Sequence, residues 1–259
     1  MLLGNAGFDM NEWIEGRVVN NIQYGDELFI LQVDAAVQPF RAGQYTKLAL
    51  DVDGERIARP YSFVNPPTND QLEFYFNRVP EGDFTSHLGQ LEEGDQILVS
   101  REPSGFFTLD EVPEAEHLWL LATGTAIGPF ISMLKTDEPW RRFSKIVLVH
   151  GVRQIDDLVY RDTISEFESS DLNRFTMVPF VTREQTDFAM QGHIQDAIKN
   201  GTLEQRVGLQ LDPEHSQVMI CGNPNMIRET KQVLTGLGLE KNLRRKPGHV
   251  TTEHYWQDD

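Results

Sequence analysis

The feature that most constrains the fold of this chain is a change of pattern near Pro113. Before it, from about residue 13 to residue 100, short β-rich runs are separated by turn residues, and one helix over 85–91 interrupts them. After it, apolar runs alternate with helix-like segments, as in a parallel sheet with crossover helices. The sequence therefore predicts a small antiparallel β-barrel followed by an α/β domain with a parallel sheet.

The same pattern predicts where the domains begin and end. A chain of 259 residues is long enough for two domains, each with its own core. Regular patterning starts only near Trp13, so we expect residues 1–10 to form a flexible extension. We expect the barrel over residues 11–110 and the α/β domain over residues 113–259, with the linker near Asp110–Pro113.

Individual elements can be predicted from the positions of the apolar runs. In the barrel we expect strands over 13–19, 28–33, 45–50, 59–64, 71–77 and 96–99. In the second domain we expect strands over 117–123, 145–150, 175–182, 217–221 and 249–256, and helices over 129–135, 158–168, 194–199 and 225–234.

Composition excludes several classes of partner. The 23 Lys and Arg residues face 40 Asp and Glu residues, and the net charge of −17 disfavours binding to nucleic acid. No apolar run is long enough to span a membrane, and the N-terminus lacks a secretory signal, so we expect a cytoplasmic protein with no membrane partner. With Cys221 alone, the chain can form neither an intrachain disulfide nor a cysteine-ligated cluster, and its seven histidines lack metal-ligand spacing.

The run Arg59-Pro60-Tyr61-Ser62 places a cation, an aromatic ring and a hydroxyl within four residues of a predicted strand. Extended geometry directs Arg59 and Tyr61 to one face and Ser62 to the other, unless the proline bends the chain. These groups suit a ligand with a phosphate, a flat ring system and a polar ring atom. The alternative is the polar face of an edge strand.

A second candidate site lies at the ends of the predicted parallel strands. The turn Gly124–Pro129 joins a strand to a helix and exposes backbone N–H groups, although it lacks the second glycine of the dinucleotide fingerprint. Arg153 follows the next strand, and Thr182 and Arg183 end the one after it. Cations at these ends favour the 2′-phosphate of NADP(H) over NAD. The alternatives are an ordinary tight turn and surface salt bridges.

Two further segments have the composition of cofactor-binding turns. Cys221-Gly222-Asn223-Pro224 ends the fourth parallel strand, where a small thiol and a glycine allow a flat ring to approach the backbone. A buried core cysteine is the alternative there. Gly82-Asp83-Phe84-Thr85 precedes the short helix of the first domain and offers amides and a hydroxyl to a pyrophosphate. An N-cap at Thr85 is the alternative, and it is compatible with that role.

Taken with the tail Glu253-His254-Tyr255-Trp256, these segments resemble the ferredoxin–NADP reductase family, in particular its bacterial ferredoxin/flavodoxin reductases. The resemblance extends from Met10 to Trp256. It implies a barrel that binds FAD noncovalently, joined to an NADP-binding α/β domain. It also implies hydride transfer between NADP(H) and FAD, and single-electron transfer between FAD and ferredoxin or flavodoxin.

The resemblance also implies roles for individual residues. Ser62, Cys221 and Glu253 correspond to the residues that align the nicotinamide with the flavin. The residues implied for FAD are Arg59, Pro60, Tyr61, Ser62, Tyr75, Asp83, Phe84, Thr85, Thr125, Tyr255 and Trp256. Those implied for NADP are Gly124, Val152, Arg153, Thr182, Arg183, His193, Gly222, Asn223, Pro224 and Glu229.

Three features bear on partners and specificity. His193 stands where the family has an arginine, which weakens NADP preference at higher pH as the imidazole loses its charge. The net charge disfavours association with acidic ferredoxins and flavodoxins, so we expect these carriers to dock on the local basic run Arg244-Arg245-Lys246. We expect the protein to be a monomer.

Either direction of electron flow between NADP(H) and the carrier fits the sequence. The alternatives are a reductase of free flavin or of an oxygenase component, and a non-catalytic flavoprotein subunit.

Overall fold

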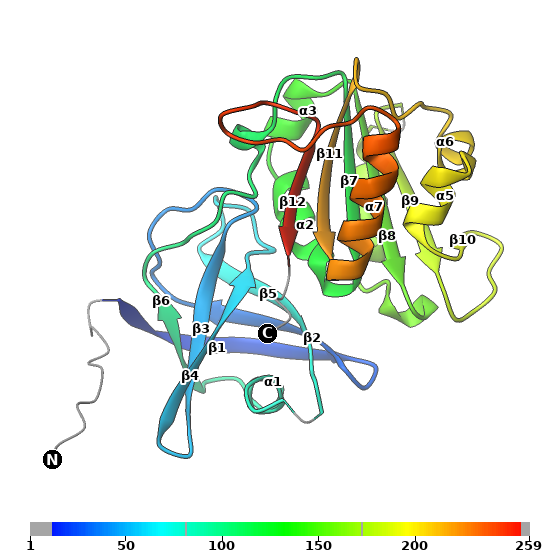
Figure 1. The fold of residues 1–259 in the computed structure, drawn as a ribbon. Helices are drawn as coiled ribbons and strands as arrows, with labels where there is room; N and C mark the ends of the chain where they lie inside the picture. The colour runs from blue at the N-terminus through cyan, green and yellow to red at the C-terminus, as the bar shows by residue number, and fades with distance from the viewer. Residues whose placement is uncertain (1–11, 81, 172, 255–259) are drawn as a thin grey trace, which may run out of the picture. The chain divides into compact units, whose positions relative to one another are not determined.

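The chain divides after Phe106 into two units, and the computed structural model describes residues 12–80, 82–171 and 173–254 (Figure 1). The first unit is built on an antiparallel sheet and the second on a parallel sheet, which confirms the fold class predicted from the change of pattern near Pro113. Within the described residues, no helix is long and apolar enough to cross a membrane.

Six antiparallel strands form the sheet of the first unit, in the order β4-β3-β6-β1-β2-β5. Just beyond β4, the Val64 amide donates to the Glu73 carbonyl of β5 at 2.9 Å. This bond links the two ends of the sheet, so the strands curl into a barrel. The strands are β1 (Trp13–Tyr24), β2 (Leu28–Asp34), β3 (Tyr45–Val52), β4 (Glu55–Ser62), β5 (Gln71–Asn77) and β6 (Gln96–Ser100).

Alternation along the strands fills the barrel. Leu72, Phe74 and Phe76 of β5 are all at most 1 % exposed and belong to one apolar cluster, whereas Tyr75 points to the opposite face of the strand. The short helix α1 (Thr85–Leu88) adds the buried Leu88 to this cluster. The Asn21 side chain of β1 donates to the Leu88 carbonyl at 3.0 Å, which ties the α1 segment to the barrel wall.

All six strands of the second unit are parallel, in the order β10-β9-β8-β7-β11-β12. The chain runs outward from β7 through β8 and β9, then returns to the other side of β7 through β11 and β12. The strand order therefore reverses between β7 and β11, which is where open α/β sheets bind ligands. The strands are β7 (His117–Thr123), β8 (Lys145–Val152), β9 (Phe175–Val181), β10 (Met190–Gln191), β11 (Ser216–Gly222) and β12 (Val250–His254).

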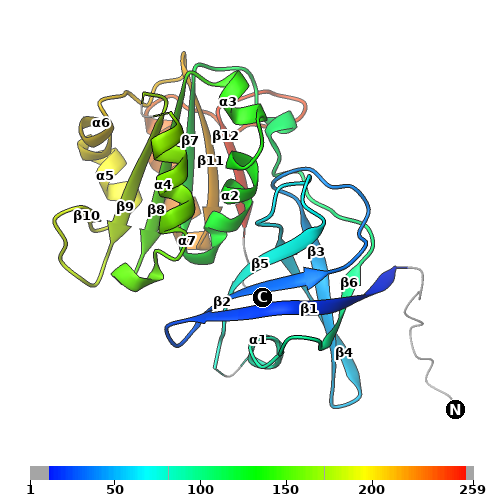
Figure 2. The ribbon, with the colours of Figure 1, turned by 180° about the vertical axis from the view of Figure 1, so that it is seen from behind.

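Helices cover both faces of this sheet. Figures 1 and 2 show α5, α6 and α7 on one face, and α2, α3 and α4 on the other. The α-helices are α2 (Gly128–Leu134), α3 (Glu138–Arg142), α4 (Arg161–Ser170), α5 (Ile194–Lys199), α6 (Thr202–Val207) and α7 (Pro224–Gly236). Short 3₁₀ turns are η1 (Leu109–Glu111), η2 (Gly124–Ile127) and η3 (Ile155–Asp157).

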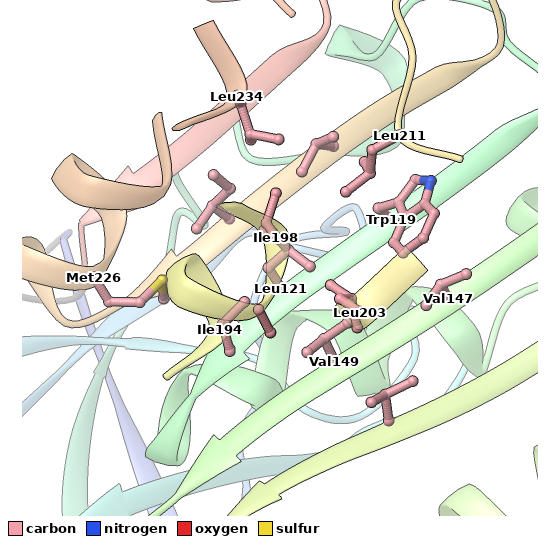
Figure 3. Packing of buried hydrophobic residues seen from close by; sticks show 14 of the residues in the cluster. Trp119, Leu121, Val147, Val149, Ile194, Ile198, Leu203, Leu211, Met226 and Leu234 are labelled. Carbon is pink, nitrogen blue, oxygen red and sulfur yellow. The ribbon is translucent and has the colours of Figure 1, made fainter. Parts of the chain in front are cut away.

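An apolar core of this unit lies between the sheet and the helices α5, α6 and α7 (Figure 3). Trp119, Leu121 and Val149 rise from the central strands and are fully buried. They pack beneath Ile198 of α5 and Leu203 of α6 in the same cluster. This packing fixes the central strands, and with them the positions of the turns at their carboxyl ends.

The predicted elements differ from the observed ones mainly in length. The first strand continues to Tyr24, because β1 and β2 pair as a hairpin up to Tyr24 and Leu28 although the segment is polar. The helix expected over 85–91 ends at Leu88. The elements α3, α6 and β10 were not predicted, since each has six residues or fewer and none carries a full amphipathic period.

Candidate active site

The run Arg59-Pro60-Tyr61-Ser62 closes β4, the first strand of the barrel sheet order. Its place at the sheet edge explains how a proline is tolerated within the strand. The Arg59 guanidinium is exposed and donates to the Ala58 carbonyl at 2.9 Å, which leaves most of its N–H groups available. Ser62 is 8 % exposed, and among the described residues its hydroxyl has no hydrogen-bond partner.

The two tyrosines of this site are held firmly. The Tyr61 ring packs against Phe84 at 6.0 Å between centroids and against Phe76 at 6.1 Å. Burial raises the pKa of the Tyr61 hydroxyl, although the charge of Arg59 acts in the opposite direction. Tyr75 is 2 % exposed on β5. Both side chains therefore offer fixed rings near the end of β4 and on the outer face of β5.

The segment before α1 forms a turn held by Thr85. The Thr85 hydroxyl accepts from the Val79 amide at 2.9 Å, and a Cβ on Gly82 would lie 3.0 Å from that hydroxyl oxygen. The helix begins at Thr85 itself with Phe84 at the N-cap, so the alternative of Thr85 as N-cap is wrong. Asp83 is exposed and Phe84 is buried. Among the described residues, the Ser86 amide donates to the Gly82 carbonyl at 3.3 Å, whereas the amides of residues 83–85 have no partner and remain available to an acceptor.

In the second unit, two glycine turns flank the reversal of strand order. The first follows β7, where Gly124 has φ of +56° and Thr125 is 5 % exposed. The second follows β11, where Gly222 has φ of +147°. Asn223 caps α7, because its side chain accepts from the amides of Asn225 at 2.9 Å and Met226 at 3.4 Å, and Pro224 opens the helix.

Cys221 and Glu253 lie beside each other on neighbouring strands, β11 and β12. Cys221 is fully buried, and burial raises the pKa of its thiol well above the ordinary value, with a further rise from the Glu253 charge. Burial raises the pKa of the half-buried Glu253 carboxyl to about 7. At neutral pH the thiol is therefore protonated, and the carboxyl is close to the midpoint of its titration.

The two arginines predicted to bind phosphate lie at adjacent strand ends. The Arg183 amide donates to the Arg153 carbonyl at 2.9 Å, and the Thr182 amide donates to the Val152 carbonyl at 3.1 Å. Both guanidinium groups are exposed, and among the described residues neither makes a hydrogen bond or an ion pair. The structure thus brings together two cations that are 30 residues apart in the sequence.

The remaining predicted nucleotide residues surround the same edge. His193 is exposed at the N-cap of α5 and follows β10, which pairs with the end of β9. Glu229 of α7 accepts from the Gln195 side chain at 2.9 Å. Tyr255 and Trp256 lie outside the described residues.

Sequence reasoning missed two residues at this edge, Thr123 and His150. The Thr123 hydroxyl accepts from the Asn223 amide at 3.0 Å, and His150 Nε2 lies 2.9 Å from the Gly124 carbonyl oxygen. Thr123 directly precedes the predicted glycine turn, which was the available signal. Nothing in the sequence marks His150, because its partner Gly124 lies 26 residues away in the turn that follows β7.

Comparisons with known proteins agree with this arrangement. Residues 20–108 match the oxidoreductase FAD-binding domain family, and residues 120–232 match the oxidoreductase NAD-binding domain family. The chain is 46 % identical over 248 residues to the flavodoxin/ferredoxin–NADP reductase of Escherichia coli (strain K12), covering 95 % of this chain and all of that protein. The chain belongs to the ferredoxin/flavodoxin–NADP reductase family. The family resemblance drawn from the sequence motifs is thereby confirmed.

Other ferredoxin–NADP reductases are similar to this chain over nearly its whole length, at lower identity. The ferredoxin–NADP reductase of Azotobacter vinelandii is 36 % identical over 247 residues, which are 92 % of this chain and 95 % of that protein. The crystal structure of a ferredoxin NADP⁺ reductase from Neisseria gonorrhoeae with bound FAD and NADP superposes with a TM-score of 0.90 at 27 % identity. It covers 95 % of this chain and 99 % of that one.

The side chains and backbone groups of the present chain fit both cofactors. In the barrel, an exposed guanidinium, a serine hydroxyl without a partner among the described residues and the amides of residues 83–85 match the phosphates and polar ring atoms of FAD. In the α/β unit, the backbone around Gly222 leaves no room for a Cβ, and the strand ends carry the exposed cations of Arg153 and Arg183. Within the described residues, no group of His, Cys, Asp and Glu is arranged to hold a metal ion.

Proposed function

We propose that this member of the family transfers hydride between NADP(H) and FAD, and single electrons between FAD and ferredoxin or flavodoxin. The close relatives named flavodoxin/ferredoxin–NADP reductase support this function, and so do the FAD- and NAD-binding domains. The observation that carries the choice of NADP(H) is the pair of exposed guanidinium groups of Arg153 and Arg183, which make no hydrogen bond or ion pair within the described residues. A 2′-phosphate is the part of NADP(H) that such a pair recognises, because guanidinium and phosphate form charge-assisted hydrogen bonds.

In the barrel, each predicted residue has a role that its surroundings support. Arg59 binds a phosphate of FAD, and the amides of residues 83–85 hold the pyrophosphate. The rings of Tyr61 and Tyr75 contact the flavin, and Pro60 holds the edge strand between Arg59 and Tyr61. Ser62 offers its hydroxyl, which has no partner among the described residues, to the flavin nitrogen that accepts hydride. When bound, FAD supplies the redox chemistry, because it accepts electrons in pairs and releases them singly.

In the α/β unit, binding is divided between two regions of one sheet edge. Arg153, Thr182 and Arg183 hold the 2′-phosphate end, with Val152, His193 and Glu229 beside them. The turns at Gly124-Thr125 and Gly222-Asn223-Pro224 bring bare backbone to the rest of the dinucleotide. The two regions lie on neighbouring strands, so one extended nucleotide can reach both.

Cys221 and Glu253 position the nicotinamide rather than react with it. A fully buried thiol with a raised pKa is not a nucleophile at neutral pH, and its small size lets a flat ring approach closely. A carboxyl with a pKa of about 7 can either donate or accept a hydrogen bond near neutrality. Both groups therefore serve alignment, which is the protein's main contribution to hydride transfer.

For the protein carrier we propose a docking surface at Arg245 and Lys246. Arg244 is less available, because its guanidinium makes two hydrogen bonds to the Glu111 carboxylate, at 2.6 and 3.0 Å. Arg245 and Lys246 are exposed on the tight turn closed by Leu243 and Lys246. Assignment of FAD binding to residues 11–110 and NADP binding to residues 113–259, a monomeric state and a cytoplasmic location remain predictions.

Turnover of the purified holoenzyme tests this function. NADPH and NADH are compared as donors, with ferricyanide, ferredoxin, flavodoxin and free FMN as acceptors. We expect NADPH to be the better donor, and the two protein carriers to be reduced faster than free FMN. Reduction of free FMN alone would identify a flavin reductase, and no turnover with either nucleotide would exclude enzymatic activity.

Removing the two strand-end cations tests the nucleotide assignment. We expect Arg153→Ala with Arg183→Ala to raise the KM for NADPH roughly 10–100-fold, since two charge-assisted hydrogen-bonding groups are lost. The KM for NADH should change little, because NADH lacks the 2′-phosphate. Arg141→Ala, at an exposed arginine of α3, is the matched control. An equal loss for NADPH and NADH would contradict the assignment.

A further inference from the structure

A buried histidine supports the first glycine turn of the nucleotide site. His150 of β8 is 2 % exposed, and its Nε2 lies 2.9 Å from the carbonyl oxygen of Gly124. Because a carbonyl only accepts, the ring must carry its proton on Nε2. The other ring nitrogen is buried without a hydrogen-bond partner among the described residues, as expected for the neutral tautomer. Burial lowers the pKa of His150 to about 4, so the donor is uncharged at neutral pH.

A threonine on the neighbouring strand holds the second turn. Thr123 is the last residue of β7, and its hydroxyl accepts from the Asn223 amide at 3.0 Å. The approach is so close that a Cβ on Gly222 would lie 2.1 Å from the same hydroxyl oxygen. Since Asn223 also caps the 13-residue helix α7, this one bond connects β7 to the start of that helix.

These two bonds restrain the flexible points of the site. Gly124 and Gly222 both have positive φ, a conformation that glycine adopts easily and leaves easily. Ala122 pairs with both His150 and Cys221, so the two bonds lie on either side of β7 at almost the same level of the sheet. One fixes the turn after β7, and the other fixes the turn after β11.

We propose that Thr123 and His150 are positioning residues for hydride transfer. Their two hydrogen bonds form a clamp: they restrain the Gly124 and Gly222-Asn223 turns, so that these turns hold the nicotinamide end of the nucleotide in a fixed position. The proposal rests on the proposed function, in which these turns hold NADP(H). Neither side chain is required to touch the nucleotide. Arg153 and Arg183 hold the 2′-phosphate at other strand ends, so loosening the clamp should impair alignment and leave 2′-phosphate binding intact. Displacements of about 1 Å can lower such rates roughly 100-fold.

Single-turnover reduction of the holoenzyme by NADPH, together with the Kd of 2′-phospho-AMP, tests the clamp. Thr123→Val removes the acceptor and nearly keeps the shape, whereas Thr123→Ser retains the hydroxyl. We expect Thr123→Val to slow hydride transfer about 10–100-fold with the Kd changed less than about twofold, and Thr123→Ser to remain within about threefold of wild type. Likewise His150→Leu should slow transfer, and His150→Gln should recover much of it by restoring an N–H donor.

Three results would overturn the clamp. They are a wild-type rate in Thr123→Val, equal losses in the Val and Ser variants, and a weakening of 2′-phospho-AMP binding in proportion to the rate. A proportional weakening of 2′-phospho-AMP binding would show that the substitution disturbs the whole α/β unit. Failure of the proposed function looks different, because wild-type enzyme would then not be reduced by NADPH at all.

Discussion

Cys221 and Glu253 show how burial changes the chemistry of two side chains. They are paired across β11 and β12, and burial raises both pKa values. For Cys221 this removes the reactivity that the sequence could suggest for a lone cysteine. For Glu253 it brings the titration into the neutral range, where a normal glutamate is fully ionised.

The raised pKa of Glu253 predicts a pH-dependent stability. The folded-state pKa of about 7 exceeds the ordinary value of 4.5, so between these values the folded protein binds a proton that the unfolded chain has released. The stability contribution of this proton is fully present below about pH 4.5 and is lost as the pH rises through about 7. Glutamine resembles the protonated carboxyl. We therefore expect Glu253→Gln to match the wild-type Tm near pH 5 and to exceed it by several degrees near pH 8.

Thermal unfolding of the holoenzyme and its Glu253→Gln variant at these two pH values measures the effect. Glu204→Gln, at a half-buried glutamate of α6, serves as the control. A Tm difference that stays the same at both pH values would mean that the Glu253 carboxyl ionises normally.

At the scale of elements, the bounds were predicted best where a strand is long, apolar and bounded by glycine. The strand over 117–123 and the helix over 194–199 have the predicted bounds, and the Gly124 turn was found as a candidate site. The polar end of β1 was missed, since pairing with β2 rather than side-chain pattern keeps it extended. The sequence did not identify Thr123 and His150 as site residues, because their roles depend on strand pairings that are known only from the folded sheet.

The turn after β11 predicts a contrast between two glycines near the ends of α7. A Cβ on Gly222 would meet Thr123 at 2.1 Å, and its φ of +147° is one that other residues rarely adopt. We expect Gly222→Ala to lower the free energy of unfolding by about 2–4 kcal/mol. Gly236 is the last residue of α7 and has open space around it, so Gly236→Ala should raise the free energy of unfolding by about 0.5–1 kcal/mol.

Urea unfolding of the two alanine variants against wild type measures both changes. The opposite signs are the essential result, because a general effect of adding a methyl group would shift both variants in one direction. A stable Gly222→Ala protein would mean that the turn after β11 relaxes more readily than its contacts indicate.

For the molecule as a whole, net charge and local charge work against each other. A net charge of −17 repels acidic carriers at a distance, yet Arg245 and Lys246 present an exposed basic turn. Electrostatic steering depends on the charges that face the partner, and salt screens it over roughly 10 Å at ordinary ionic strength. The sequence predicted this run as a docking site, but not that Glu111 engages Arg244 and so divides the run.

Charge reversal tests whether this basic turn steers the carrier. We expect Arg245→Glu with Lys246→Glu to lower the second-order rate of ferredoxin reduction about tenfold or more at low salt, because an attractive patch becomes repulsive. The difference should shrink as salt is raised, and the rate with ferricyanide should not change. Lys199→Glu with Arg206→Glu, on α5 and α6, alters net charge equally and serves as the control. If the control slows ferredoxin as much, net charge governs association and the basic turn is not the docking site.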